Sequence, residues 1–215
     1  GDSLAYSFTS SIPTFRENGY NTMFFTGYAC RYYDTNEKPF EEKGARDIPV
    51  CRIGSKVFLD YLNENMKAND IVIINFASRG DIVDEKYEQS IEYYAKYLLK
   101  INDIAVKKKG KIFVLSQLHQ LQLSFDPSKC FVLPSIVGDA TCQPEIQNID
   151  ITKTKTYNNF DFYLNNILKT KNIKIINMRD RLSMKDISYL DFYNISHLSK
   201  FGVEKVMPLI LDQIK

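Results

Sequence analysis

The sequence predicts an α/β fold, a three-layer α/β/α sandwich around a mainly parallel central sheet. Short apolar runs rich in β-branched or aromatic residues alternate along the chain with longer stretches whose apolar residues recur every three or four positions. Regular alternation of strand and helix implies a parallel sheet that helices cover on both faces. The chain has 215 residues, 44% of them apolar, which is enough for one sizeable core.

Four apolar runs are the predicted strands, and four amphipathic stretches are the predicted helices. We expect strands at residues 20–26, 70–77, 111–118 and 173–178. We expect helices at residues 55–68, 84–107, 157–170 and 203–214. Because the sequence has no internal repeat, low-complexity tract or Gly/Ser-rich linker, we expect residues 1–215 to form a single domain.

The balance of charge and hydropathy argues against several classes of partner. Lys and Arg total 28 against 26 for Asp and Glu, so no broad basic field is available to hold a nucleic-acid backbone. No run approaches the roughly 18 to 20 consecutive apolar residues of a membrane span, although such a chain can be a fragment of a longer membrane protein. The carboxylates show no metal-ligand spacing, so we expect no metal.

Four cysteines fall into two local pairs, Cys30 with Cys51 and Cys130 with Cys142. Neither pair has the spacing or the neighbouring histidines of a zinc site. Local pairing is the simplest of the three possible connectivities and would place the protein in an oxidising compartment. Four reduced thiols in a cytosolic protein are the alternative.

Ligands of parallel sheets bind outside the carboxyl ends of the strands. This rule directs attention to Gly27, residues 75–80 and residues 117–120, each of which follows a predicted strand. It also raises a question about the opening triplet, because a Gly-Asp-Ser turn of this fold would follow a first, central strand. Either that strand lies in residues absent from this sequence, or the triplet is not the motif.

Two short blocks carry a resemblance to a known family. "GDSLAYS" begins the chain, and "FYNISHLSKFGVEKV" occupies residues 192–206. They resemble the first and last blocks of the SGNH, or GDSL-type, hydrolases and acyltransferases. The order of motifs and cysteines is similar to that of the extracytoplasmic SGNH domains fused to integral-membrane acyltransferases that O-acetylate bacterial surface polysaccharides. The resemblance implies a flavodoxin-like SGNH domain, here as a fragment of a longer membrane protein.

The resemblance implies that Ser3 is the nucleophile and His197 is its base. A serine hydroxyl needs a base within hydrogen-bond reach to accept its proton. Imidazole, with an unperturbed pKa near 6.5, can accept and return that proton around neutral pH. An exposed terminal serine and a structural histidine are the alternative.

The third catalytic position departs from the family pattern, because Asn194 stands where the family has Asp three residues before His. An amide can orient the imidazole but cannot stabilise its positive charge. Asn194 or a backbone carbonyl can serve a Ser3–His197 dyad, Asp191 can take the orienting role, or the position was changed to give an inactive form.

The resemblance places an oxyanion hole at the same edge of the sheet. Its donors would be the amide of Ser3, the backbone N–H of Gly27 and the side chain of Asn75. Ser78 or Arg79 is the alternative to Asn75.

The implied function is transfer of an acetyl group to a sugar hydroxyl of a bacterial surface polysaccharide through a Ser3 acyl-enzyme. No bound cofactor is expected, since the acetyl group would derive from acetyl-CoA and arrive through a separate membrane domain. The expected location is extracytoplasmic, tethered to the inner membrane, with a glycan acceptor as partner. A carbohydrate O-acetyl esterase and a non-catalytic glycan-binding domain are the alternatives.

Overall fold

The structure is a computed structural model. The described residues are 3–25, 49–75, 86–116, 118, 151–169, 171–180, 182, 191–192 and 197–215. Among these residues, no helix combines the length and apolar character that crossing a membrane requires.

A parallel sheet of three strands, β1 (Ile71–Ile74), β2 (Lys111–Leu115) and β3 (Ile173–Ile176), lies at the centre of the fold. The strands are adjacent in the order β1-β2-β3, with Ile71 beside Lys111 and Ile112 beside Ile173. This arrangement confirms the predicted α/β class and three of the four predicted strands.

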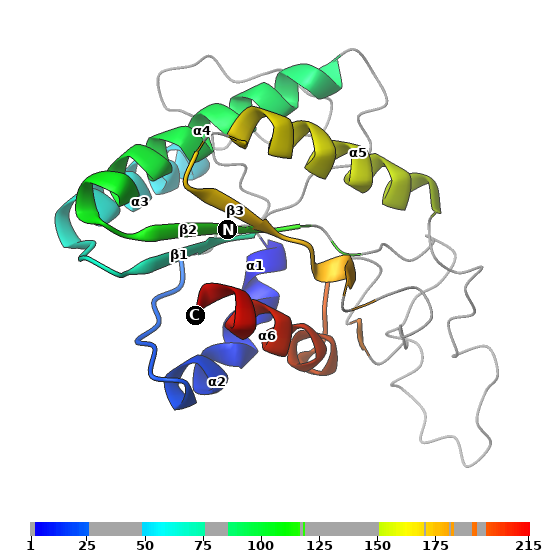
Figure 1. Ribbon diagram of the computed structural model, residues 1–215, viewed down its shortest axis with the longest axis horizontal. Helices are drawn as coiled ribbons and strands as arrows, with labels where there is room; N and C mark the ends of the chain where they lie inside the picture. The colour runs from blue at the N-terminus through cyan, green and yellow to red at the C-terminus, as the bar shows by residue number, and fades with distance from the viewer. Residues whose placement is uncertain are drawn as a thin grey trace.

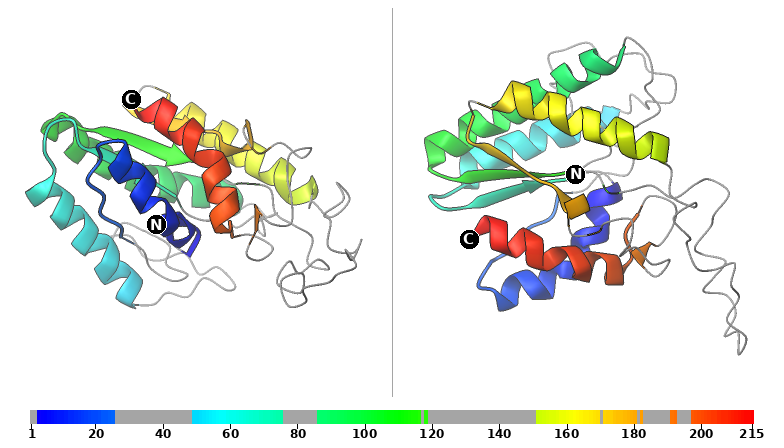
Figure 2. Two further views of the ribbon diagram at one scale, coloured as in Figure 1. Left: turned by 90° about the horizontal axis from the view of Figure 1, so that it is seen from below. Right: turned by 45° about the vertical axis from the view of Figure 1, so that its right-hand side comes forward.

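Helices cover both faces of the sheet, which gives the expected three layers (Figures 1 and 2). One face carries α3 (Pro49–Asn65), α4 (Lys86–Lys108) and α5 (Ile151–Leu168). The other carries α1 (Ser3–Ser7), the 3-10 turn η1 (Phe8–Ser11), α2 (Ile12–Glu17) and α6 (Lys200–Ile214). The two ends of the chain therefore lie on the same side of the sheet.

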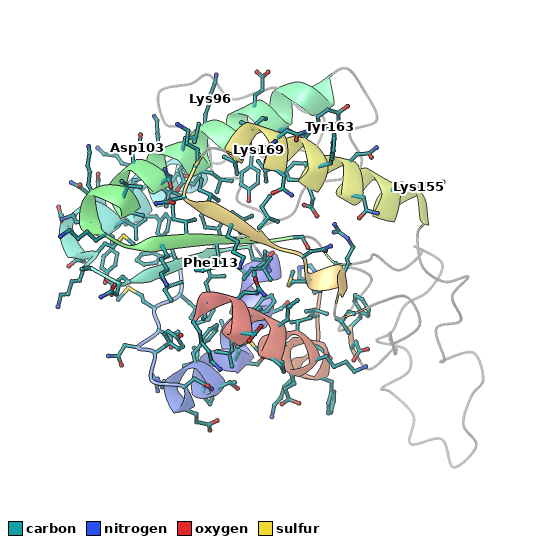
Figure 3. All side chains as sticks on the ribbon, in the orientation of Figure 1. Lys96, Asp103, Phe113, Lys155, Tyr163 and Lys169 are labelled. Atoms are coloured by element: carbon teal, nitrogen blue, oxygen red, sulfur yellow. The ribbon has the colours of Figure 1, made fainter. Side chains whose placement is uncertain are left out.

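Alternate residues of β2 face the two helical layers, as the pleat of a strand requires. Phe113 and Leu115 pack with α6, and Figure 3 shows Phe113 below the sheet. Ile112 and Val114 pack with α3, α4 and α5. Because both sides are covered, every β2 residue after Lys111 is buried, which explains why the strand reads as a continuous apolar run.

The segment 20–26, predicted as a strand, is not one in its described part, residues 20–25. These residues lie across a cavity from β1 and share no strand ladder with it. The prediction was wrong because an apolar, aromatic run reports burial, whereas a strand also needs a neighbour within hydrogen-bond distance.

The helix predictions are confirmed with shifted bounds. The two amino-terminal helices show no clear period in the sequence, since each has fewer than two full turns. The helix predicted at residues 157–170 begins earlier, at Ile151, because its polar first turns carry no apolar pattern.

Candidate functional site

Each strand of the sheet is followed directly by a polar side chain at the carboxyl edge. Asn75 follows β1, Ser116 follows β2 and Asn177 follows β3. Asn75 and Ser116 are buried. Sequence reasoning selected Asn75 but missed Ser116 and Asn177, because the predicted third and fourth strands ran past them. The sequence did carry a signal for them, because each apolar run that forms a strand is followed directly by a polar residue.

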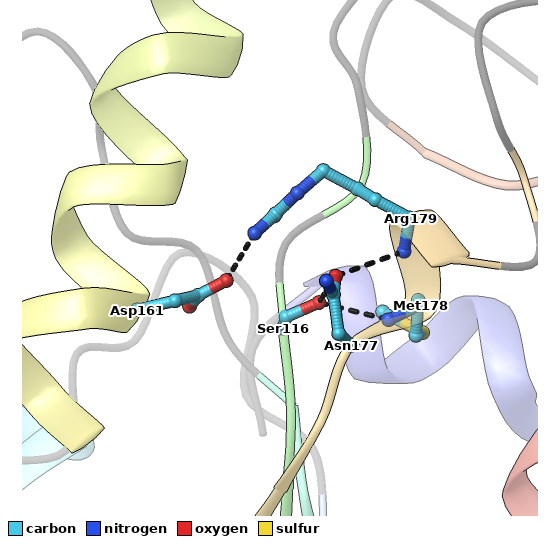
Figure 4. A network of polar contacts seen from close by, with 5 residues as sticks. All are labelled: Ser116, Asp161, Asn177, Met178 and Arg179. Carbon is cyan, nitrogen blue, oxygen red and sulfur yellow. Dashed lines mark hydrogen bonds and ion pairs between the residues drawn. The ribbon is translucent and has the colours of Figure 1, made fainter.

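Ser116 and Asn177 connect the ends of β2 and β3 (Figure 4). Ser116 Oγ donates to Asn177 Oδ1 over 3.2 Å and accepts from the Met178 N–H over 2.9 Å. Asn177 Oδ1 also accepts from the Arg179 N–H over 3.2 Å. These bonds hold the two strand ends together and start the 3-10 turn η5 (Met178–Asp180).

A buried ion pair ties this edge to α5. Arg179, immediately after the Ser116 network, pairs through its Nη2 with Asp161 Oδ2 of α5 (Figure 4). Burial raises the pKa of Asp161 above its ordinary value, and the Arg179 guanidinium opposes that rise by its charge and its hydrogen bond. The pair anchors the end of β3 to α5. Burial makes ionisation of the Asp161 carboxyl group unfavourable, and the Arg179 guanidinium offsets part of that cost.

His197 lies at the end of a loop whose two sides are joined to each other. Phe192 and Leu198 form an antiparallel bridge, and the Ser199 N–H donates to the Asp191 carbonyl over 2.9 Å. Phe192 and Leu198 are buried, whereas His197 is half-buried. The bridge thus fixes the backbone on the carboxyl side of the imidazole.

The start of α6 gives a physical reason for the His-Leu-Ser-x-x-Gly pattern. Ser199 is the N-cap of the helix, and its hydroxyl accepts from the Gly202 N–H over 3.3 Å. A Cβ at Gly202 would lie 2.1 Å from the Asp191 carbonyl oxygen, so only glycine permits this approach. The glycine of this pattern therefore allows the backbone at Asp191 to lie directly against the first turn of α6.

Asp191, the alternative orienting acid, is bound by a lysine from the same helix. Its side chain is 1% exposed, and its Oδ2 lies 2.7 Å from the Lys205 Nζ. Lys205 stands one turn after Gly202, so the carboxylate and the carbonyl of Asp191 both rest on α6. Asp191 holds the loop that ends in His197.

The segment that begins at Ser3 packs on the helix that follows His197. Ser3 is the first residue of α1, and the next turn, η1, contacts α6. Phe8 and Phe15 share one core with Leu198, Val203 and Met207. The two ends of the chain are thus brought to one region, as the catalytic hypothesis requires. The side chain of Ser3 lies outside what the structure describes.

Asn75, the predicted oxyanion donor, is 6% exposed at the end of β1. It lines a cavity of about 710 Å³ together with Ala5 of α1. Its Oδ1 has no hydrogen-bond partner among the described residues. Asn75 and Ala5 thus line the same cavity, and the role of Asn75 as an oxyanion donor stays a prediction.

Several predicted residues lie outside the described part of the chain. They are Gly27, Asn194, Ser78, Arg79, Cys30, Cys130 and Cys142. Cys51 lies on the first turn of α3, but its side chain is also outside the described set, so both disulfides stay predictions. Within the described ranges, no three His, Cys, Asp or Glu side chains are grouped to hold a metal ion.

Comparison with known proteins gives matches in structure but not in sequence. No family model matches the sequence, and no curated protein matches it. The periplasmic domain of a lipopolysaccharide acetyltransferase from Salmonella ser. Paratyphi A superposes with a TM-score of 0.69 at 12% identity, covering 100% of this chain and 81% of that one. A GDSL-like lipase from Bacteroides thetaiotaomicron superposes with a TM-score of 0.52 at 13% identity, covering 100% of this chain and 84% of that one. The chain therefore has the SGNH-type fold that its two terminal motifs predicted.

Proposed function

We propose that this chain is an acyl-transfer domain that acetylates a sugar hydroxyl of a bacterial surface polysaccharide. The observation that carries the proposal is the packing of the Ser3 segment on α6, the helix whose first turn fixes the loop of His197. The structural neighbour from Salmonella, a lipopolysaccharide acetyltransferase domain, supports acetyl transfer to a glycan.

In this reaction Ser3 and His197 exchange one proton in each half. Ser3 Oγ attacks the carbonyl carbon of an acetyl ester while His197 takes the hydroxyl proton, and the leaving group departs with that proton. The sugar hydroxyl then attacks the acetyl-serine as His197 takes its proton. The C–O bond to Ser3 breaks, the serine regains the proton, and the acetylated sugar leaves.

The developing negative charge on the acetyl oxygen needs donors that are already in place. We assign this role to the amide of Ser3, the N–H of Gly27 and the Nδ2 of Asn75. The position of Asn75 at the carboxyl end of β1 supports its part in the set.

Asn194 is proposed to orient His197, because it stands three residues before His197, where the resembled family has its orienting aspartate. Asn194→Asp then restores a charge beside the imidazolium and raises turnover, since an aspartate there is worth several powers of ten in a related triad. The measurement is kcat against an acetyl ester. An unchanged or lower kcat would assign the orienting role elsewhere.

We further propose that the domain is extracytoplasmic and belongs to a longer membrane protein. The acetyl group would derive from acetyl-CoA and reach Ser3 through a fused or associated membrane domain, which delivers it to a glycan acceptor. Disulfides Cys30–Cys51 and Cys130–Cys142 would suit that compartment. The periplasmic origin of the Salmonella neighbour supports this location.

A carbohydrate O-acetyl esterase is the second candidate, favoured by the likeness to a GDSL-like lipase. Transferase and esterase share every catalytic group and differ in whether a sugar hydroxyl or water reaches the acyl-enzyme. A glycan-binding domain without catalysis is the third candidate.

One experiment separates the three. The protein is given an acetyl ester donor with and without purified surface polysaccharide, and acetylated sugar is measured by mass spectrometry. Transfer predicts acetylated polysaccharide that disappears in Ser3→Ala but persists in Ser10→Ala, a matched control at an exposed serine of η1. Donor hydrolysis without sugar acetylation assigns an esterase, and polysaccharide binding without either reaction assigns a binding domain.

A further inference from the structure

The solvent side of α5 carries aromatic, amide and basic side chains and no exposed acid. The exposed described residues of the helix, with the lysine that follows it, are Lys155, Asn158, Asn159, Phe162, Tyr163, Asn165, Asn166, Ile167 and Lys169. The helix contains one acidic residue, Asp161, whose side chain is 14% exposed and paired with Arg179. The surface is therefore basic and rich in hydrogen-bonding groups.

Five of these side chains form one row along the helix. They follow one another at alternating spacings of four and three residues, which makes them neighbours on a helix surface: Lys155, Asn159, Phe162, Asn166 and Lys169. Fourteen residue steps of 1.5 Å make this row about 21 Å long. Figure 3 shows Lys155 and Lys169 far apart along the helix, with Tyr163 between them. We call these five residues the α5 row.

An aromatic ring occupies the centre of the α5 row. Phe162 is 63% exposed, and its ring meets that of Tyr163 edge-on with the centroids 5.8 Å apart. Tyr163 is 43% exposed. A phenylalanine stabilises a protein mainly when it is buried, so this ring contributes little to the core. Grouped exposed apolar residues with a polar rim mark a binding surface.

Asparagines flank the ring on both sides of the row. Asparagine is a weaker helix former than the alanine, lysine or glutamate typical of an exposed helix face, so local stability does not explain these residues. Each amide offers two donors and an acceptor oxygen. A sugar ring can pack its C–H face on an aromatic ring while its hydroxyl groups exchange hydrogen bonds with such amides. The centre of the row therefore has the chemistry of a sugar-binding surface.

The lysines at the two ends add a preference for negative charge. Among the described residues, neither Lys155 nor Lys169 forms an ion pair. Positive charge at both ends complements a ligand that carries negative charge along its length. A helix that binds a membrane surface instead has a wide apolar side set against a basic one. In the α5 row an asparagine stands on either side of the ring, which favours an acidic polysaccharide over a membrane.

The direction of α5 connects the row to the candidate site. α5 and β3 run in opposite directions, so the start of the helix lies toward the carboxyl end of β3 (Figure 1). The pair of Asp161 with Arg179 fixes the helix to that end. A chain bound along the row therefore reaches the edge of the sheet where Ser116 and Asn177 close their strands.

We propose that the α5 row binds a segment of an acidic polysaccharide and directs it to the carboxyl edge of the sheet. The identity of this ligand as the acetyl acceptor rests on the proposed function. Phe162, with Tyr163 beside it, supplies the surface on which a sugar ring packs. The asparagines bind hydroxyl groups, and Lys155 and Lys169 pair with carboxylate groups of the chain.

Isothermal titration calorimetry with two soluble polymers tests the proposal on the full chain. The probes are polygalacturonate, a polymer of a uronic acid, and dextran, which is neutral. Polygalacturonate is expected to bind more tightly than dextran at low salt, and the difference is expected to shrink as salt screens the lysines. Equal affinities for the two polymers, or no binding of polygalacturonate, would overturn the proposal.

Substitutions at Phe162 separate ring stacking from general apolar contact. Phe162→Leu keeps an apolar side chain but loses the flat ring, so its affinity for polygalacturonate should fall about tenfold, whereas Phe162→Tyr should retain it. Val57→Ala, at an exposed apolar residue of α3, is the matched control and should bind like the unchanged protein. Thermal unfolding checks that each variant is folded. Full affinity in Phe162→Leu would overturn the proposal.

A pair of double variants tests the charges. Lys155→Gln with Lys169→Gln should lower the affinity for polygalacturonate about fivefold and remove most of its salt dependence. Lys56→Gln with Lys107→Gln makes the same change of net charge at exposed lysines of α3 and α4, and should have little effect. Equal losses in the two double variants would show attraction by net charge alone and would overturn the proposal.

Other occupants of the α5 row give different results. Binding to vesicles of phosphatidylglycerol and phosphatidylcholine that persists in Phe162→Leu but is lost without the two lysines would assign the row to a membrane surface. A dimer seen by analytical ultracentrifugation that Phe162→Leu dissociates would assign it to a second copy of the chain. Either result would overturn the proposal.

Kinetics separate this proposal from the proposed function. Phe162→Leu should hydrolyse a small acetyl ester at the unchanged rate, while its KM for an acidic polysaccharide acceptor rises about tenfold. Acetyl transfer with an unchanged KM would overturn the role of the α5 row and leave the proposed function in place. Binding of polygalacturonate that depends on the row, without any acetyl transfer, would do the reverse.

Discussion

Two aspartates, each paired with a cation from another element, hold two different parts of the site edge. Asp161 of α5 pairs with Arg179 at the end of β3, and Asp191 of the histidine loop pairs with Lys205 of α6. The first pair joins a strand to a helix within the body of the fold. The second joins α6 to the loop that ends in His197. We therefore expect the Asp161 pair to affect stability alone and the Asp191 pair to affect activity as well as stability.

The two pairs also differ in exposure. The side chains of Arg179 and Asp161 are 7% and 14% exposed, whereas Lys205 is 42% exposed and Asp191 is 1% exposed. Lys205 is partly hydrated, but its partner carboxylate is buried, so removing the lysine leaves a buried charge without that cation and costs stability as well. The pair also fixes the position of the loop, because it joins Asp191 to α6.

The largest effect is expected from His197→Ala, which removes the proposed base. His197 lies at the end of the loop that the Asp191–Lys205 pair holds. Activity on an acetyl ester should fall by about 10²- to 10⁴-fold, the usual contribution of a positioned acid–base group. The melting temperature should change little, since His197 is half-buried in a loop. Steady-state kinetics and thermal unfolding measure the two quantities, and retained activity would remove His197 from the mechanism.

Gly202→Ala should disturb the same loop from the side of α6. A Cβ there would meet the Asp191 carbonyl at 2.1 Å, so the loop must move by roughly 1 Å, a displacement that can cost about 10²-fold in rate. Overpacking should also lower the free energy of unfolding by about 1 to 3 kcal/mol.

Gly54→Ala is the matched control for that variant. Gly54 is exposed within α3, and a Cβ there would meet nothing within 4 Å. It should stabilise the protein by about 0.5 to 1 kcal/mol through helix propensity and leave activity unchanged. Equal effects of the two substitutions in urea unfolding and kinetics would contradict the close contact at Gly202.

Lys205→Met and Asp161→Asn compare the two pairs directly. Lys205→Met keeps the apolar stem and removes the charge, so kcat should fall about tenfold with KM retained, and the free energy of unfolding should also fall because the buried Asp191 carboxylate loses this cation. Asp161→Asn should lower the free energy of unfolding by about 2 kcal/mol, because Arg179 loses its charged partner, while kcat stays near that of the unchanged protein. Recovery of kcat in Lys205→Arg would separate positioning from folding. A lowered kcat in Asp161→Asn, with kcat unchanged in Lys205→Met, would contradict the assignment.

The smallest effect concerns the pH dependence of stability. Burial raises the pKa of Asp161 above 3.8, so between 3.8 and the folded-state value the native protein binds more protons than the unfolded chain. The contribution of Asp161 to stability is therefore present below 3.8 and declines as the pH rises through that window. Thermal unfolding across this range should show a steeper decline in the unchanged protein than in Asp161→Asn. Parallel curves would contradict the raised pKa.

The sequence was sufficient to predict the fold class, because three apolar runs and four amphipathic stretches each report a local pattern. The run at residues 20–26 was mistaken for a strand because its apolar and aromatic composition is that of a buried strand, whereas Asn21 and Met23 are exposed and its described part has no strand pairing. Ser3 and His197 were selected from their motifs, and their catalytic roles stay predictions. The role of Asp191 could not be found that way, because it depends on Lys205 and Gly202 of a helix whose approach no local pattern encodes.

The central claim is that Ser3 and His197 work in one site, and a serine-directed fluorophosphonate tests it most directly. The reagent is mixed with the protein, and the labelled peptide is identified by mass spectrometry over time. We predict rapid labelling at Ser3 that slows by at least about 10²-fold in His197→Ala. Labelling of Ser3 at the same rate without the imidazole, or no labelling at Ser3, would contradict the claim.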